Sequence, residues 1–415
     1  MEQVGRRLRA RTERALKAFR VVIVTGPRQC GKTTLVRQIL ADHPGTFRSL
    51  DDSRTLAAAL VDPVGFAQYG VPPRAIDEIQ FGGEALVRAI KLHVDRDPVP
   101  GQYLLTGSTD FLTVPGLSES LAGRAVLLDL WPFSQGELHG APDGFVDIAF
   151  RAPESLRGGP PARFAPRDYL ALLCAGGYPE AVGLDDELRG LWFDSLIQTI
   201  TQRDVADLTG ARRASELPRL LAILAARTAG ELVVSQINAD FGLARHTTED
   251  YIGFLRMTNL VREVPAWAGS HATRAKRRPK IHLTDTGMAS HLLGADVDAL
   301  LQPEDRRRGP LTETFVVNEL RKQLSWSKTR ADLLHYRDRN QEVDVILETP
   351  DGRIVALEIK SGLTVNAGSF RHLAAMRDRL GDAFVHGFVL SFADTPLSFG
   401  DRLTSVPVSY LWEAG

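Results

Sequence analysis

Short apolar runs alternate with amphipathic stretches through the first third of the chain. Residues 21–24 (Val-Val-Ile-Val) and 103–105 (Tyr-Leu-Leu) have the character of buried strands, and residues 125–130 repeat it. Residues 34–40, which follow the first of these runs, have the apolar spacing of a helix. Because continuous apolar strands that alternate with helices are typical of parallel sheets, this pattern predicts an α/β domain.

The pattern changes after residue 216. Helical segments at residues 217–224, 233–237 and 245–255 are followed by two short apolar strands on either side of the basic stretch 274–280. Three helices and a two-stranded wing with a cationic tip are the plan of a winged helix-turn-helix module, whose third helix can enter a DNA major groove. A module that only packs domains together would have the same pattern and is the alternative.

The last third of the chain contains a predicted strand pair. Its strands are residues 342–348 and 354–360, joined at residues 350–352 (Pro-Asp-Gly). If these three residues form the loop, Asp344 lies directly opposite Glu358. One face of the pair then carries only aliphatic side chains and is the expected core face, whereas the other face is charged.

Composition limits the expected partners and cellular location of the protein. The 50 lysines and arginines nearly balance the 51 acids, so net charge implies no polyanionic partner and any nucleic-acid surface must be local. The two cysteines, Cys30 and Cys174, form neither a disulfide framework nor a zinc spacing. No signal-peptide core and no run near roughly 18 apolar residues is present, so we expect a cytoplasmic protein without a membrane partner.

The first apolar strand leads into a phosphate-binding loop. Residues 26–33 match the pattern G-x-x-x-x-G-K-[ST] between a predicted strand and a predicted helix. In such a loop the backbone N–H groups point at phosphate oxygens, Lys32 reaches the β- and γ-phosphates, and Thr33 ligates magnesium. The sequence therefore predicts a site for ATP and Mg2+. Its predicted residues are Gly26, Pro27, Arg28, Gln29, Cys30, Gly31, Lys32, Thr33 and Thr34.

An acidic pair and a polar strand end complete this predicted site. Asp77 and Glu78 follow a short apolar strand, where Asp77 would hold the magnesium through water and Glu78 would deprotonate the attacking water. Ligands gather at the carboxyl ends of parallel strands, so Thr106 or Ser108 would contact the γ-phosphate. A hydroxyl that caps the next helix is the alternative for these two residues.

Several arginines and lysines indicate further partners. Arg124 precedes a strand, where a surface position is the usual explanation, but in an oligomeric ATPase it would stabilise charge on a neighbour's nucleotide. Residues 1–20, with arginines at 6, 7, 9, 11, 14 and 20, predict a solvated helix that packs onto the ATPase core or, alternatively, a nucleic-acid arm. Clustered cations favour DNA as a partner, and a homo-oligomer is left open. The cations of the predicted wing are Arg274, Lys276, Arg277, Arg278 and Lys280.

The charged face of the predicted strand pair is a second candidate site. Opposed carboxylates are unfavourable unless a cation lies between them, so Asp344 and Glu358 predict a bound Mg2+ ion. Lys360, on the same face, would stabilise the hydroxide nucleophile or the charge on a scissile phosphate. Glu313 or Glu319, on a predicted amphipathic helix upstream, would supply a third acid. A solvent-exposed hairpin with ordinary surface charges is the alternative.

Five motifs carry a family resemblance. They are the phosphate loop, Asp77-Glu78-Ile79-Gln80, Leu105-Thr106-Gly107-Ser108, Leu121-Ala122-Gly123-Arg124 and Gly176-Gly177-Tyr178-Pro179-Glu180. Together they resemble a prokaryotic family of AAA-type ATPases, although Cys30 stands where an aliphatic residue is usual. Members carry a C-terminal domain of unknown function, which residues 284–288 (Thr-Asp-Thr-Gly-Met), Glu313 and the Asp344, Glu358, Lys360 set also resemble. That domain looks like the restriction-endonuclease fold with its D…E-x-K signature.

We therefore expect an α/β protein in three parts. A P-loop parallel-sheet domain of the AAA type, with a helical extension, would span residues 1–210, a winged helix-turn-helix module residues 211–285, and a restriction-endonuclease-like α/β domain residues 286–415. The predicted function is ATP binding and hydrolysis in an enzyme that acts on DNA, with a Mg2+-dependent nuclease-like domain. The alternative is an ATP-switched regulator that binds DNA or protein, or a toxin-like protein, with a non-catalytic nuclease fold.

Overall fold

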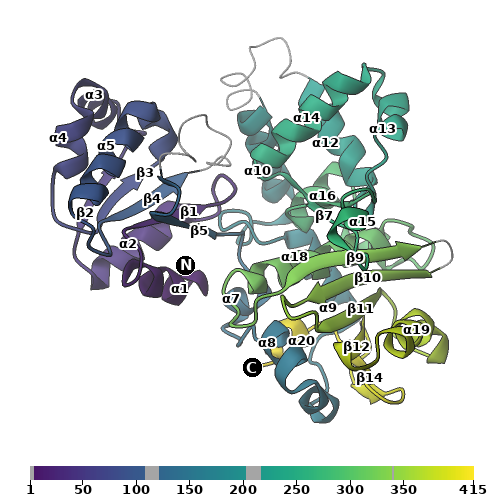
Figure 1. Cartoon of the computed structure of the whole chain (residues 1–415). Helices are drawn as coiled ribbons and strands as arrows, with labels where there is room; N and C mark the ends of the chain where they lie inside the picture. Colours follow the sequence, from purple (N-terminus) through teal and green to yellow (C-terminus); the bar gives the residue numbers. More distant parts are fainter. Residues whose placement is uncertain (1–3, 108–120, 202–215, 339–340) are drawn as a thin grey trace. The chain divides into compact units, whose positions relative to one another are not determined.

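The computed structural model describes the chain except for residues 1–3, 108–120, 202–215 and 339–340 (Figure 1). It divides into two compact units. The N-terminal unit comprises Met1–Phe133 with Met257–Asn259, and the C-terminal unit comprises Ser134–Arg256 with Leu260–Gly415. Each unit has its own sheet and its own apolar clusters.

The N-terminal unit is built on a parallel sheet with the strand order β2-β3-β4-β1-β5 (Figure 1). All residues of β1 and β4 are buried, as parallel strands covered on both faces require. The α/β class and the parallel sheet that the apolar runs predict are confirmed. The strands are β1 (Val21–Thr25), β2 (Thr46–Ser49), β3 (Arg74–Asp77), β4 (Tyr103–Gly107) and β5 (Ala125–Asp129).

Helices cover both faces of this sheet. Successive side chains of a strand point to opposite faces, so Val22 contacts the cluster under α1 and α2, while Ile23 contacts the cluster under the other helices. The carboxyl end of β1 runs directly into the phosphate loop, which therefore lies at the carboxyl ends of the parallel strands. The helices are α1 (Leu8–Leu16), α2 (Lys32–Asp42), α3 (Ser53–Val61), α4 (Pro63–Gln68) and α5 (Gly83–Arg96).

The C-terminal unit contains a mixed sheet in the order β13-β14-β12-β11-β10-β9. The pairs β9–β10 and β10–β11 are antiparallel, whereas β11–β12 and β12–β14 are parallel. The strands are β9 (Asp332–Asp338), β10 (Gln341–Glu348), β11 (Ile354–Lys360), β12 (Phe384–Ser391), β13 (Leu397–Ser398) and β14 (Leu403–Pro407).

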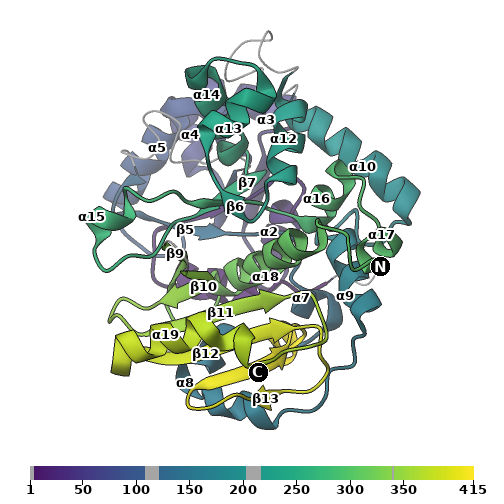
Figure 2. The same cartoon turned by 90° about the vertical axis from the view of Figure 1, so that its right-hand side faces the viewer.

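Both faces of the strand pair β10–β11 carry buried residues, including the face that carries Asp344 and Glu358. Leu357 belongs to the large cluster that includes α8 (Phe145–Arg151) and α18 (Arg308–Leu324). Ala356 packs in a second cluster under α19 (Arg371–Leu380), which crosses the sheet in Figure 2. Segments far from the hairpin in sequence cover both faces, so the predicted aliphatic core face is buried and the alternative of a solvent-exposed hairpin was wrong.

Helices and a small antiparallel sheet, in the order β6-β8-β7, make up the rest of the C-terminal unit. Helices α12, α13 and α14 and strands β7 and β8 lie within a few residues of the segments that the sequence pattern predicts. The bounds are α7 (Gln135–His139), α9 (Pro166–Ala175), α10 (Asp186–Thr199), α12 (Leu217–Ala226), β6 (Gly230–Glu231), α13 (Val234–Phe241), α14 (Arg245–Met257), β7 (Val261–Val264), α15 (His271–Arg274), β8 (Lys280–Leu283), α16 (Thr286–Leu292), α17 (Val297–Leu301) and α20 (Tyr410–Glu413).

The observed division of the chain differs from the predicted boundaries. The expected boundaries after residues 210 and 285 both fall inside the C-terminal unit, and the observed one lies between Phe133 and Ser134. A continuous apolar cluster explains this, because it includes Phe145, Leu221 and Trp412 together. Residues from Ser134 onward, apart from Met257–Asn259, therefore belong to the C-terminal unit.

Candidate nucleotide site and carboxylate cluster

The phosphate loop turns sharply from β1 into α2. A side chain at Gly26 would place its Cβ 1.9 Å from the Leu130 carbonyl oxygen, so only glycine fits there. Gly31 precedes α2 with φ +97°, in the left-handed region that glycine adopts without strain. The loop therefore ends on the N-terminus of α2, whose first N–H groups can donate to an anion.

The Lys32 ammonium lies within the loop. It donates to the carbonyl oxygens of Gly26 at 3.0 Å and Pro27 at 2.8 Å, and the side chain is buried. These carbonyls belong to the loop that would surround phosphate, so the ammonium can exchange them for phosphate oxygens. The remaining predicted loop residues are the half-buried Arg28 and the exposed Gln29 and Thr34.

Asp77 joins the loop to the neighbouring strands. The Thr33 hydroxyl donates to Asp77 Oδ2 at 2.9 Å, and the Thr106 hydroxyl donates to Asp77 Oδ1. The backbone N–H of Glu78 donates to the same Thr106 hydroxyl at 3.3 Å. Thr33 and Asp77 thus present a hydroxyl and a carboxylate side by side, a donor set that fits Mg2+. Thr106 positions both acids, a role that the sequence did not indicate.

Glu78 has an uncommon backbone conformation. Its φ of +53° lies in the left-handed region, which costs a residue other than glycine on the order of 1 kcal/mol or more. Its Oε2 accepts a hydrogen bond from Gln80 Nε2, and the side chain is half-buried. The strain is held at the end of β3, next to Asp77, where a general base is predicted.

Cys30 and Arg6 support the loop from beneath. Cys30 is fully buried, its Sγ donates to Leu130 O at 3.3 Å, and burial raises the pKa of the thiol. A buried thiol packs like a small apolar side chain, which explains why cysteine replaces an aliphatic residue here. Arg6 donates to the carbonyl oxygens of Cys30, at 2.7 Å, and Trp131. Sequence reasoning assigned Arg6 to a solvated helix and missed this contact.

Arg124 lies at the amino-terminal ends of the strands, opposite the carboxyl ends where the phosphate loop begins. Its carbonyl accepts from the N–H of Val21, at the start of β1, whereas the loop follows Thr25 at the end. The guanidinium pairs with Asp95 at 2.5 and 2.9 Å. The structure therefore does not bring Arg124 to the nucleotide site of its own unit. Ser108, the other predicted phosphate contact, lies outside the described residues.

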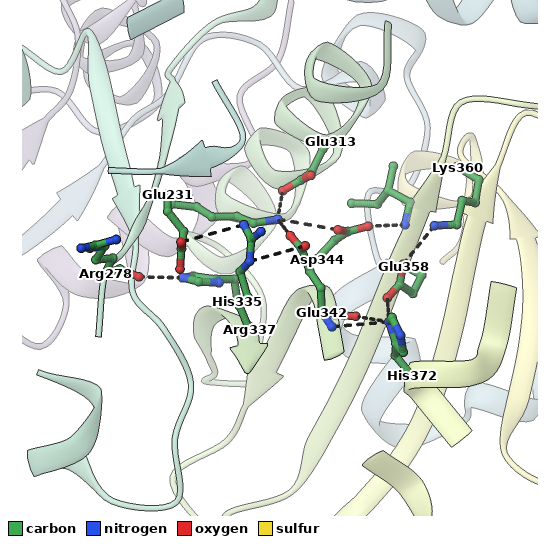
Figure 3. Close-up of polar contacts among 12 residues, drawn as sticks. Glu231, Arg278, Glu313, His335, Arg337, Glu342, Asp344, Glu358, Lys360 and His372 are labelled. Carbon is green, nitrogen blue, oxygen red and sulfur yellow. Dashed lines mark hydrogen bonds and ion pairs between the residues drawn. The ribbon is translucent and has the colours of Figure 1, made fainter. Parts of the chain in front are cut away.

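The second candidate site lies where α18, β10 and β11 meet (Figure 3). Extending the register that begins at Val345↔Leu357 by one residue places Asp344 opposite Glu358, as predicted. Asp344 Oδ2 accepts a hydrogen bond from the Ile359 N–H at 2.8 Å. This bond lies beyond Val345↔Leu357, the last regular pair of β10 and β11 at this end. The Asp344 carboxylate therefore accepts the Ile359 N–H in place of a backbone carbonyl of the neighbouring strand.

Glu358 is buried between Lys360 and His372. Its Oε2 accepts from Lys360 Nζ at 3.2 Å. Its Oε1 is 3.9 Å from His372 Nδ1 and has no hydrogen-bond partner within the described part of the chain. Burial, and then the neighbouring Asp344, raises the pKa of Glu358 to about 8.

The ammonium of Lys280, on β8, lies among three carboxylates, which we call the carboxylate cluster: Glu313, Glu342 and Asp344. Nζ is 2.7 Å from Glu313 Oε1, 3.0 Å from Glu342 Oε1 and 3.7 Å from Asp344 Oδ1. Burial lowers the pKa of Lys280, but attraction by the carboxylates outweighs it and raises this pKa above its ordinary value. Lys280 is only 1% exposed, so its prediction as a nucleic-acid contact was wrong.

Glu313 is the acid that α18 brings to the cluster. Burial and then Asp344 raise the pKa of Glu313 to about 8. Glu319, the alternative third acid, is held elsewhere, because its Oε2 accepts from the Gln135 N–H at 2.9 Å and its Oε1 from Lys322 at 2.6 Å. Of the two acids proposed on this helix, only Glu313 joins Asp344.

As the side chains lie, a divalent ion does not fit the cluster. The Lys280 ammonium takes the place between Glu313 and Asp344 that a metal ion would share. Across the described ranges, no group of three or more His, Cys, Asp or Glu side chains is arranged to hold a metal ion. The Mg2+ assignment to Glu313, Asp344 and Glu358 remains a prediction that needs another arrangement.

A pocket of about 310 Å³ adjoins the cluster, since Arg337 Nε on its wall is 3.9 Å from Glu342 Oε2. His335 is fully buried and its Nε2 donates to the Arg278 carbonyl at 3.1 Å. Burial lowers the pKa of His335 to about 4, so the ring is neutral at pH 7. The lining residues are Glu231, Ala266, Arg277, Arg278, His335, Arg337 and Asp338.

Two motifs of the family resemblance meet in a structural contact. Asp285 Oδ2 accepts from the N–H of Gly177 at 2.8 Å, and its Oδ1 accepts from the N–H of Met288 at 3.0 Å. A side chain at Gly176 would place its Cβ 2.2 Å from Asp285 Oδ1. The glycines and the aspartate therefore fasten the start of α16 to the end of α9.

Comparison with known proteins identifies the class of the N-terminal unit. Residues 18–139 match a family model described as an AAA domain, so the chain contains an AAA-type ATPase domain, as predicted. Residues 166–299 and 308–411 match two models, each described as a domain of unknown function (DUF8612 and DUF4143). The matched ranges of the first two domains along the chain end at residues 139 and 299.

Uncharacterized proteins of Mycobacterium tuberculosis and Mycobacterium bovis are each 29% identical, over 98% of this chain and 84% of the relative. A solved Walker-type ATPase of Pyrococcus abyssi is 17% identical, covers 70% of this chain and 96% of its own, and has a TM-score of 0.41. AMPPCP-bound DnaA from Aquifex aeolicus is 14% identical, covers 60% and 85%, and has a TM-score of 0.30. In the described part of the chain, no helix is long and apolar enough to cross a lipid bilayer.

Proposed function

We propose that the N-terminal unit binds ATP with Mg2+ and hydrolyses it. The observation that carries this proposal is the hydrogen bond between Thr33 and Asp77, at 2.9 Å. It joins the helix after the phosphate loop to the acidic end of β3, so the two expected magnesium ligands are already adjacent. The match of residues 18–139 to the AAA domain supports the same activity.

Each residue has a separate task in this proposal. Lys32 exchanges the loop carbonyls for β- and γ-phosphate oxygens, and bound Mg2+ would neutralise charge that develops during phosphoryl transfer. Glu78 accepts the proton of the attacking water, and Thr106 holds the backbone N–H of Glu78 in place. Gln80 fixes the Glu78 carboxylate until water and nucleotide are present.

Steady-state hydrolysis by the full chain tests this proposal. Glu78→Gln keeps the shape of the side chain but cannot accept a proton, so we expect ATP binding to persist and turnover to fall by about two orders of magnitude or more. Glu84→Gln, the same change at an exposed acid that pairs with Arg88, is the matched control. Equal turnover in Glu78→Gln and wild type would refute the role of Glu78.

We also propose that the C-terminal unit binds DNA through its basic segment. Helices α12 to α14 with strands β7 and β8 follow the order of a winged helix-turn-helix module. The pocket beside the carboxylate cluster supports a phosphate contact, because Arg277, Arg278 and Arg337 line it. ATP hydrolysis in one unit would then switch nucleic-acid binding in the other.

A restriction-endonuclease-like domain is the finer proposal for the residues that follow. The opposition of Asp344 and Glu358, with Lys360 bonded to Glu358, supports it. Because the cluster does not fit a divalent ion as its side chains lie, we derive no cleavage step. The proposal for this domain is a nuclease-like fold whose metal site depends on Lys280, and the non-catalytic regulator is its alternative.

A further inference from the structure

The place that a metal ion would take in the carboxylate cluster is filled by the chain itself. We propose that the Lys280 ammonium is the resident cation of this cluster and excludes divalent ions from it, so that the cluster binds a metal only when Lys280 is removed. This inference rests on the metal-site part of the nuclease-like proposal and is independent of ATP hydrolysis.

The contacts join one charged donor to oxygen acceptors of three acidic side chains. The distances of 2.7 Å to Glu313 and 3.0 Å to Glu342 are in the range of charge-assisted hydrogen bonds. Asp344, at 3.7 Å, contributes mainly through its charge. One ammonium thereby offsets part of the negative charge of three acidic side chains that would otherwise repel one another in a buried place.

A metal ion and this ammonium cannot be present together. A divalent ion would need Glu313 and Asp344 oxygens at about 2.0–2.6 Å, and the same two carboxylates flank the ammonium. The ammonium would then lie against the metal, where repulsion and crowding both oppose binding. Exclusion is therefore a direct result of geometry.

A second observation points to a latent ligand position. Glu358 is 6% exposed, and its Oε1 has no hydrogen-bond partner among the described residues. Lys280 contacts the three acids of the cluster, whereas Glu358 contacts Lys360 and His372. Figure 3 shows Glu358 and Asp344 on neighbouring strands, with Glu313 reaching toward them from the helix above. Removing the ammonium would leave Glu313 and Asp344 without their cation, and Glu358, opposite Asp344, carries this unsatisfied oxygen.

The small sheet holds Lys280 in position. On β8, Lys280 pairs with Glu231 of β6 on one side and with Val264 of β7 on the other. Arg274, just before β8, forms an ion pair with Glu348 of β10 at 2.5 Å. The segment that carries the cation is thus tied to the strand that carries Asp344.

Manganese binding to the nucleotide-free, full-length protein tests the inference. We compare wild type, Lys280→Gln and the control Lys276→Gln, which makes the same change at an exposed lysine of the same segment. Electron paramagnetic resonance counts bound Mn2+, and melting curves with and without Mn2+ report stabilisation. The nucleotide site is identical in all three proteins, so only differences between them are read.

We expect Lys280→Gln to bind one more Mn2+ ion than wild type, with an affinity at least about tenfold higher than that of the wild-type cluster. The melting temperature of Lys280→Gln should also rise when Mn2+ is added. Lys276→Gln should behave as wild type. The additional Mn2+ binding should disappear in Lys280→Gln/Asp344→Asn. If Lys280→Gln does not fold, Lys280→Gln/Glu342→Gln removes one charge of each sign, keeps the predicted ligands and carries the same expectation.

The outcomes separate the two proposals. If wild type and Lys280→Gln both bind a Mn2+ ion that Asp344→Asn removes, the exclusion is overturned but the metal site is kept. If a folded Lys280 variant binds no Mn2+ ion at the cluster, the exclusion and the metal site are both overturned. Additional binding that persists after Asp344→Asn also overturns the inference, because the ion would then bind elsewhere. None of these outcomes bears on ATP hydrolysis, which the Glu78→Gln assay tests separately.

Discussion

The Thr33 hydroxyl donates a hydrogen bond to Asp77 at 2.9 Å and so joins the first turn of α2 to the end of β3. The two groups come from segments about a βαβ unit apart in the sequence, yet the fold places them within hydrogen-bond distance of each other. Preorganised groups of this kind stabilise developing charge without reorganising during the reaction. The predictions for the N-terminal unit follow from this arrangement.

Lys32→Ala should abolish ATP binding. The lysine supplies the positive charge that the backbone N–H groups of the loop cannot replace, and its ammonium already lies within the loop. Isothermal calorimetry with ATP and Mg2+ measures the loss. Lys17→Ala, an exposed lysine at the end of α1, is the control and should bind as wild type. Unchanged ATP affinity in Lys32→Ala would remove the site assignment.

Thr106→Val should lower kcat and leave KM for ATP nearly unchanged. The change keeps the side-chain volume but removes the hydroxyl that donates to Asp77 and accepts from the Glu78 N–H. We expect turnover to fall by about one to two orders of magnitude, since the base is no longer positioned. A fall in ATP affinity with unchanged kcat would instead assign Thr106 to nucleotide binding.

Asp344→Ala should destabilise the C-terminal unit by about 1–3 kcal/mol. An isolated pair of opposed carboxylates would become more stable when one is removed, but here the change leaves the Ile359 N–H without its acceptor. Asp344→Asn retains an oxygen acceptor and should be destabilised less. Urea unfolding of the two variants and wild type measures the difference. Greater stability of Asp344→Ala would show that carboxylate repulsion dominates.

His386 should make stability fall in mild acid. Burial, and then Arg157, lowers the pKa of this histidine to about 4, against an ordinary value of 6.5, so folding favours the neutral ring. Its contribution is therefore full above pH 6.5 and is lost as the pH falls through 4, by at most about 3 kcal/mol. Melting temperatures measured from pH 7 to pH 4 should fall less steeply with pH for His386→Gln than for wild type. The exposed His246→Gln is the control, and equal slopes would contradict the prediction.

Arg277→Ala/Arg278→Ala should weaken DNA binding and flatten its salt dependence. The slope of log affinity against log salt should fall by about 0.9 for each DNA phosphate that the variant no longer binds. Fluorescence anisotropy with a short duplex at several salt concentrations measures the slope. Arg167→Ala, at an exposed arginine that pairs with Asp298, is the control. An unchanged slope would assign the small sheet and its helices to packing alone.

Local patterns predicted the features that depend on neighbouring residues. The phosphate loop was recognisable because strand, loop and helix are consecutive, and the opposition of Asp344 and Glu358 followed from the length of one turn. The ATPase domain and its parallel sheet are confirmed on that basis. Their physical cause is short-range, so one sequence was sufficient.

Features that depend on distant segments could not be predicted in the same way. Lys280 looked like one more cation of a basic stretch, because nothing near it in sequence indicates acids 33 residues away at Glu313. Arg6 likewise supports Trp131, which is 125 residues further along the chain. Both are buried charges whose partners are brought close only by the fold. Because burying an unpaired charge is unfavourable, the local sequence alone predicts an exposed side chain for each.

The packing of residues after Ser134 against the far end of the chain has a consequence for biosynthesis. Tyr410 donates to the carbonyl of Pro160 across 250 residues, and Trp412 lies in the same apolar cluster as Phe145. At a translation rate of about 5–20 residues per second, the early helices remain without these partners for roughly 12–50 seconds. During that interval nearly all of the nucleotide-binding unit has already been synthesised, while an apolar surface behind it has no cover. We therefore expect ribosome-bound chains of intermediate length to bind ATP and to be captured by chaperones at the same time.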